Sequence, residues 1–84
     1  MSTSVQQSGY SSDVRMQLNV NGFVLKIDQL GPQFIILRDP VDHPSVNAEI
    51  VMSIDGRVRR WNVHLPDGIS PDRPRTKTAA PLAS

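Results

Sequence analysis

Two segments of the chain alternate apolar and polar residues on either side of a turn signal. Val14–Val20 has an apolar side chain at every second position, the period of a strand with one buried face. Asn21-Gly22 follows, and Phe23–Leu30 resumes the alternation. Asn-Gly favours a two-residue type I′ turn, because both positions of that turn need positive φ. The pattern therefore predicts a β-hairpin over residues 14–30.

The register of this hairpin provides a test of the prediction, because a slip of one residue would exchange the two faces. On one face the expected pairs are all apolar: Val20 with Phe23, Leu18 with Leu25, and Met16 with Ile27. On the other face Arg15 lies opposite Asp28, which predicts a cross-strand ion pair.

A second hairpin passes the same test. Val46–Ile54 and Arg57–Leu65 flank Asp55-Gly56, which is again a type I′ signal. The expected apolar pairs are Val46 with Leu65, Ala48 with Val63, and Ile50 with Trp61, and Met52 with Arg59 continues the same face. Asn47 and His64 pair on the solvent side. Trp61 is therefore expected in the core.

Between the hairpins, Gln33–Arg38 contains four consecutive apolar residues, which indicates a strand covered on both faces. Asp39–Pro44 is predicted to be a loop, since its two prolines interrupt strand pairing. Five strands with apolar faces must close into a barrel or stack as a sandwich. At this strand number we expect an all-β fold, a small antiparallel barrel of five to six strands over residues 13–66.

The two ends of the chain differ from the middle in composition. Residues 1–12 are rich in Ser and Gln, and residues 67–84 contain three prolines and few hydrophobic residues. Such segments bury too little apolar surface to offset the entropy lost on ordering. Both are expected to be disordered tails.

Composition narrows the classes of function. The chain has 84 residues and no cysteine, which excludes disulfides and thiolate metal sites. Nine Lys and Arg face eight Asp and Glu, so no bulk attraction to nucleic acid or to an anionic membrane is expected. Neither a secretory signal nor a stretch of about 20 apolar residues is present. The default expectation is a cytoplasmic protein with no membrane partner.

Candidate catalytic groups are few. Only His43 and His64 could serve as imidazole bases, and the most abundant nucleophile, serine, lies mostly in the two tails. Asp39, Asp42 and His43 could offer metal ligands, but no tetrahedral set is apparent, and a solvated loop explains them. We therefore expect no enzyme, no metal and no cofactor.

The segment Arg57–Trp61 sets arginines beside an aromatic ring, a combination that can hold phosphate while a base stacks on the ring. Strand alternation, however, points Arg60 away from the face that carries Arg59 and Trp61. The other residues of that face are apolar, which indicates that Trp61 packs in the core. Nucleic-acid binding is therefore not expected.

A series of features from residue 23 to 65 resembles a known family. Val24–Asp28 is a strand that ends in Asp, and Gln29–Gly31 is a short turn. Phe34–Leu37 is an apolar strand, Pro40–Pro44 is a Pro-containing loop, and Asp55-Gly56 closes a hairpin. In this order they resemble the PilZ domain, a small β-barrel known for binding cyclic di-GMP. The likeness covers about half of the chain and implies a barrel.

The functional motifs of that family match only in part. Its nucleotide binders carry two arginines just before the barrel, where this chain has Arg15 alone. Its D/N-x-S-x-x-G motif would begin at Asp28, but Leu30 stands in place of the Ser and Gln33 in place of the Gly. The resemblance therefore carries over two positions, Arg15 and Asp28.

Two functions follow as hypotheses. The first is a non-catalytic interaction domain that binds another protein or a second copy of itself, because a minimal core leaves strand edges available for pairing. The alternative is a PilZ-like binder of a cyclic dinucleotide or another anionic ligand, with Arg15, Asp28, Arg59 and Arg60 around the barrel mouth. The arginines must converge in space for the alternative to have a site.

Overall fold

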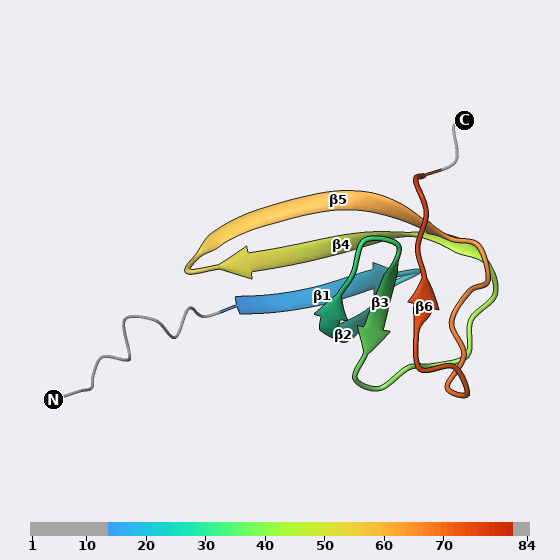
Figure 1. The fold of residues 1–84 in the computed structure, drawn as a ribbon. Coiled ribbons are helices and arrows are strands. Elements are labelled where there is room, and N and C mark those ends of the chain that lie inside the picture. Colours follow the sequence, from blue (N-terminus) through green and yellow to red (C-terminus); the bar gives the residue numbers. More distant parts are fainter. Residues whose placement is uncertain (1–13, 82–84) are drawn as a thin grey trace, which may run out of the picture.

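The computed structural model describes residues 14–81, which form one sheet of six antiparallel strands (Figure 1). The strands are β1 (Val14–Val20), β2 (Phe23–Leu30), β3 (Phe34–Leu37), β4 (Val46–Ile54), β5 (Arg57–Leu65) and β6 (Thr76–Lys77). Their order in the sheet is β5-β4-β1-β2-β3-β6. The sheet curls strongly into a half-barrel, so the predicted all-β class and strand number are confirmed. Within the described residues no helix is long and apolar enough to cross a lipid bilayer.

The two predicted turns shape both hairpins. Asn21 and Gly22 have φ values of 45° and 87°, and Asp55 and Gly56 have 51° and 84°. Positive φ at both central positions is the mark of a type I′ turn. The register between β4 and β5 is as predicted along the whole hairpin, from the pair at residues 46 and 65 to the pair at residues 54 and 57.

The first hairpin follows its predicted register only in part. The pairing of β1 with β2 ends at Gln17 and Lys26, so Met16 and Ile27 do not face each other. A bulge between Ile27 and Gln29 turns β2 onto β3. A bulge bends its strand and increases the local twist. From this point β1 and β2 separate.

The predicted cross-strand pair of Arg15 and Asp28 is therefore wrong. Arg15 lies opposite Ser53 of β4. The Asp28 carboxylate instead accepts a hydrogen bond at 2.8 Å from Nε of Arg38, the residue that follows β3. The separation of β2 from β1 at the bulge is the physical reason, because it moves Asp28 out of the β1 register.

The concave face of the sheet carries the core. Its most buried side chains come from every long strand and from the segment before β6: Leu18, Val20, Ile27, Ile35, Leu37, Ala48, Ile50, Val63, Leu65 and Ile69. Trp61 is half-buried and packs against this cluster. Phe23, which shares its predicted apolar face with Val20, is 55% exposed, although Val20 itself is 1% exposed.

The last strand supplies a partner for β3. β6 pairs Thr76 with Ile35 and Lys77 with Phe34, and the Thr78 amide donates to the Gln33 carbonyl at 2.9 Å. Without β6, the outer edge of β3 would expose its backbone groups beside the fully buried Ile35.

The segment before β6 is also held in place. Ile69 is 1% exposed and exchanges two backbone hydrogen bonds with His43, of 2.9 and 2.8 Å. Gly68 precedes it with a φ of 64° and lies so close to the His43 carbonyl that a Cβ would overlap it. Only glycine combines this backbone conformation with such a close approach.

The expectation of a disordered C-terminal tail thus needs correction over residues 67–81, which the structure places in the fold. One isoleucine and a short strand are enough to order this segment. Ile69 covers part of the apolar face of the sheet, and β6 covers the outer edge of β3. Residues 1–12 and 82–84, for which disorder was also expected, lie outside the described residues.

We predict that Ile69→Ala lowers the free energy of unfolding by about 2–5 kcal/mol, because it leaves a cavity in the core. Ile69→Val should lower the free energy of unfolding by only about 0.5–1.5 kcal/mol, so it keeps the prediction testable if Ile69→Ala does not fold. Urea denaturation followed by Trp61 fluorescence gives the values. Val24→Ala is the control, since Val24 is 62% exposed. Equal losses for Ile69→Ala and Val24→Ala would contradict a packed C-terminal segment.

Candidate functional site

The two ends of the sheet meet at a single backbone bridge. The His64 amide donates to the Ala79 carbonyl at 2.9 Å, and the Ala79 amide donates to the His64 carbonyl at 2.8 Å. These bonds join the end of β5 to the chain just after β6, where the two ribbons cross in Figure 1. Among residues 14–81, the half-barrel is thus closed at one end, and no other strand pairs with the outer edge of β5.

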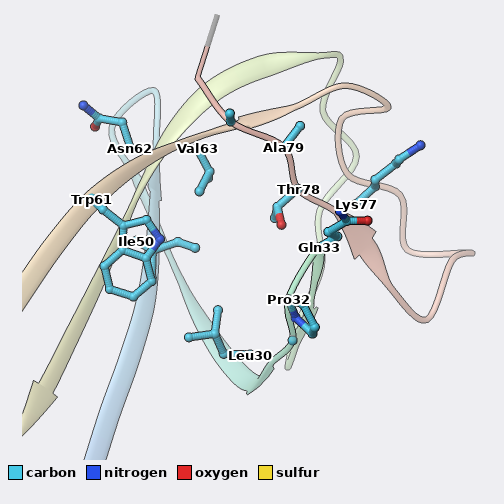
Figure 2. Close-up of a pocket in the computed structure, with 12 residues that line it drawn as sticks. Leu30, Pro32, Gln33, Ile50, Trp61, Asn62, Val63, Lys77, Thr78 and Ala79 are labelled. Carbon is cyan, nitrogen blue, oxygen red and sulfur yellow. The ribbon is translucent and has the colours of Figure 1, made fainter.

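A cleft of about 690 Å³ lies beside this bridge (Figure 2). β4 and β5 form one side of it, and the turn before β3 and the chain from Lys77 onward form the other. The lining residues are Leu30, Gly31, Pro32, Gln33, Ile50, Trp61, Asn62, Val63, Lys77, Thr78, Ala79 and Ala80.

The lining of the cleft mixes apolar and polar groups. Leu30, Trp61 and Val63 contribute apolar surface, while Gln33 and Thr78 contribute polar groups, and the Asn62 side chain points away from the cleft (Figure 2). Among the residues that the structure describes, Lys77 is the one charged residue that lines it. Such a lining suits a small group, for example an amino-acid residue, that has an apolar part and also a hydrogen-bond acceptor.

Trp61 has a role that the sequence did not reveal. It was expected in the core, and it does pack against the core cluster. The same indole also lines the cleft, opposite Pro32 and Thr78 in Figure 2. The opening in front of Trp61 depends on where residues 77–80 run, and those residues were expected to be disordered.

The predicted ligand residues do not gather at one place. Strand alternation and the observed registers put Arg15 and Arg60 on the convex face, on strands separated by β4. Arg59 lies opposite Met52 on the concave face. Asp28 lies at the bulge on β2. One ligand site shared by all four residues is therefore not formed.

Arg60 is part of a polar network on the convex face. Its guanidinium lies 3.5 Å from the Glu49 carboxylate, which also accepts a hydrogen bond from Asn19 at 3.1 Å. Gln17 donates in turn to Asn19 at 3.1 Å. These contacts cross β1, β4 and β5 and fix the side chains of the face that does not carry the core.

Arg15 lines a different hollow, at the place where β1 and β2 separate. This groove has a volume of about 540 Å³, and its cations are Arg15, Lys26 and Arg38. The Arg38–Asp28 ion pair, with N···O of 2.8 Å, lies at its edge. The bulge thus brings cations from β1, β2 and the end of β3 to one groove, which sequence spacing alone did not predict.

Arg59 lines a third hollow, of about 450 Å³, near the tip of the β4–β5 hairpin. Arg57, Met52, Ile54 and Asp55 complete its lining. The two arginines on the concave side of β5 thus lie close to the apolar side chains of β4 rather than to Arg15.

Three polar side chains at the base of β4 and β5 have the order of a nucleophile, a base and an orienting group. His64 Nδ1 lies 2.8 Å from Asn47 Oδ1, and His64 Nε2 lies 3.5 Å from Ser45 Oγ. The pairing of Asn47 with His64 was predicted, whereas Ser45 was not. The Ser45 contact is at the outer limit of a hydrogen bond. None of the three residues lines any of the three hollows described above.

The loop that offered metal ligands is occupied by internal contacts. His43 Nε2 lies 3.1 Å from Asn21 Nδ2, and His43 Nδ1 lies 2.8 Å from the Pro44 carbonyl. Across residues 14–81 no group of three His, Cys, Asp or Glu side chains is arranged to hold a metal ion.

Comparisons of this chain with protein-family models, with curated proteins and with solved structures find no match. The resemblance to PilZ domains therefore rests on the order of sequence features alone.

We predict that Ala79→Pro opens the closed end of the half-barrel, because proline has no amide to donate to His64. Loss of one such bond is worth about 0.5–1.5 kcal/mol, which corresponds to as much as a tenfold faster hydrogen exchange at the His64 amide. Ala79→Val keeps the amide and should leave that rate close to the wild-type value. An unchanged His64 rate in Ala79→Pro would mean that the bridge does not close the sheet.

Proposed function

We propose that this domain is a non-catalytic protein-binding module and that its site is the cleft between β5 and the chain that follows β6. The observation that carries the proposal is the position of Trp61, half-buried in an open hollow beside a sheet edge. One side of the indole packs on the core, and the other side is available to a partner.

The energetics of protein interfaces support this choice. Residues that dominate binding are enriched in Trp, Tyr and Arg and lie in pockets that exclude water once the partner is bound. Trp61 already packs against the core on one side, so its ring loses little conformational freedom when a partner covers the other side. The polar groups of Gln33 and Thr78 can satisfy backbone groups of a partner.

The neighbouring edge of β5 favours an extended partner segment. β5 pairs with β4 on one side, and on its other side the described residues provide only the bridge at Ala79. Peptides that add to a sheet edge gain affinity from main-chain hydrogen bonds and specificity from side-chain pockets. The cleft lies next to such an edge and provides such a pocket.

We predict that peptides selected for binding from a displayed random library shift the NMR signals of Trp61, Asn62 and Thr78. Trp61→Ala should weaken their binding about 30-fold, equivalent to ~2 kcal/mol, and Trp61→Phe should restore part of it. Phe23→Ala is the matched control, because Phe23 is an exposed aromatic at the turn end of the first hairpin.

The ¹⁵N spectrum of each variant shows whether it is folded before its affinity is measured. Two results contradict the proposal: a library that yields no binder, or binders that are insensitive to Trp61→Ala and shift signals elsewhere.

A second candidate function comes from the basic groove. Arg15, Lys26 and Arg38 line it, and Asp28, the residue that matches the PilZ motif, holds Arg38 at its edge. Convergent cations can bind phosphate groups, and arginine does so through paired hydrogen bonds. These contacts support a PilZ-like binder of a cyclic dinucleotide, at a groove that includes Arg15 but excludes Arg59 and Arg60.

This candidate predicts saturable shifts of Arg15, Lys26 and Arg38 when the ¹⁵N-labelled protein is titrated with cyclic di-GMP. Arg15→Ala should abolish them, and Arg59→Ala, which alters a cation in another hollow, should not. Rising salt should weaken the binding, since phosphate contacts are screened. A flat titration would contradict a dinucleotide site.

A further inference from the structure

The outer edge of β5 presents a regular row of backbone groups. In a two-residue hairpin the residues next to the turn form a hydrogen-bonded pair, here Ile54 and Arg57. Alternate β5 residues therefore direct their N–H and C=O groups away from β4: Val58, Arg60, Asn62 and His64. The bridge to Ala79 agrees with this phase, because both of its hydrogen bonds use His64.

The same strand carries a concentration of positive charge. Arg57, Arg59 and Arg60 are all exposed, and β5 contains no Asp or Glu. Glu49 of β4 contacts Arg60, yet 61% of the Arg60 side chain remains exposed. Arg57 and Arg59 lie on the concave face and Arg60 on the convex face, so a strand beside β5 would meet arginine on both of its faces.

We propose that an acidic, extended segment of a partner protein adds to the edge of β5 as a seventh strand. Its backbone pairs with Val58, Arg60 and Asn62, and one of its apolar side chains enters the cleft beside Trp61. The inference rests on the proposed function and names the chemistry of the partner. Opposite charges across neighbouring strands stabilise a pair, and burial of the edge strengthens each hydrogen bond.

Charge argues against a second copy of the chain as the occupant. Two β5 edges that paired about a two-fold axis would bring three arginines from each copy into adjacent strands. Like charges directly opposite each other destabilise a strand pair. The arginines thus protect the edge from self-pairing and leave it open to an acidic strand.

The alternation of β5 specifies the pattern of the partner. On the concave face the partner segment needs an apolar residue beside Trp61 and acidic residues beside Arg59 and Arg57. On the convex face it needs an acid beside Arg60. In antiparallel orientation, the orientation that the chain at Ala79 has relative to β5, the sequence Thr-Leu-Glu-Glu-Val-Glu fits residues 62 back to 57.

The experiment uses this blocked hexapeptide as the probe for the full chain. We expect it to shift the amides of Val58, Arg60 and Asn62 and to slow their hydrogen exchange. The charge-reversed Thr-Leu-Lys-Lys-Val-Lys should bind at least ten times more weakly. Backbone N-methylation of the probe at its first, third and fifth residues should abolish binding, because these amides face β5. Methylation at the second, fourth and sixth residues should be tolerated.

Variants of the protein separate charge from strand addition. Arg57→Ala combined with Arg59→Ala should weaken the acidic probe about tenfold or more. Lys26→Ala is the matched control, since Lys26 is an exposed cation on β2. Equal affinity for the acidic and the basic peptide would overturn the assignment of an acidic partner.

The failure of this inference can be distinguished from failure of the proposed function. An acidic probe that leaves residues 58, 60 and 62 unperturbed overturns strand addition, whether or not library peptides bind in a Trp61-dependent way. If such peptides do bind, the protein-binding function stands with another partner chemistry. Protection of the same amides on raising the protein concentration, with a doubled mass in sedimentation, would assign the edge to a second copy and overturn the inference.

Discussion

The structure depends on keeping one apolar face away from water. Leu18, Ile35 and Leu65 are fully buried on the concave side of the sheet, although they come from strands far apart in its order. A flat sheet of this size would leave these side chains exposed, so the hydrophobic effect selects the curled form. The bulge in β2 and the short strand β6 serve this requirement, one by bending the sheet and the other by covering the edge of β3.

The apolar face of the sheet is incompletely covered at the candidate site. β5 is longer than the described chain that reaches its outer edge, so within residues 14–81 the pairing stops at His64 and leaves the rest of the edge open. Trp61 lies beside this opening and takes part in both core and cleft. Trp61 would therefore contribute to both folding and binding. A stability measurement on each Trp61 variant is needed to separate its effect on folding from its effect on affinity.

The sequence was informative wherever structure is local. Asn21-Gly22 and Asp55-Gly56 fix two turns, and the β4–β5 register follows from the second without further information. The contribution of Ile69 and Thr76 could not be predicted, because each is a single residue in a Pro-rich segment whose partners lie far away in the chain. The groove of Arg15, Lys26 and Arg38 was missed for a similar reason: it depends on a bulge at Asp28 that alternation does not reveal.

The shortness of β6 has a consequence for the motions of the domain. Its two residues form two cross-strand pairs with β3, while β4 and β5 form nine. Local opening costs least where few backbone bonds and little apolar contact have to be broken. The C-terminal segment should therefore detach and return many times during one lifetime of the intact sheet. Each detachment would briefly expose β3 as a second edge, in addition to the edge of β5 that the described part of the chain leaves unpaired.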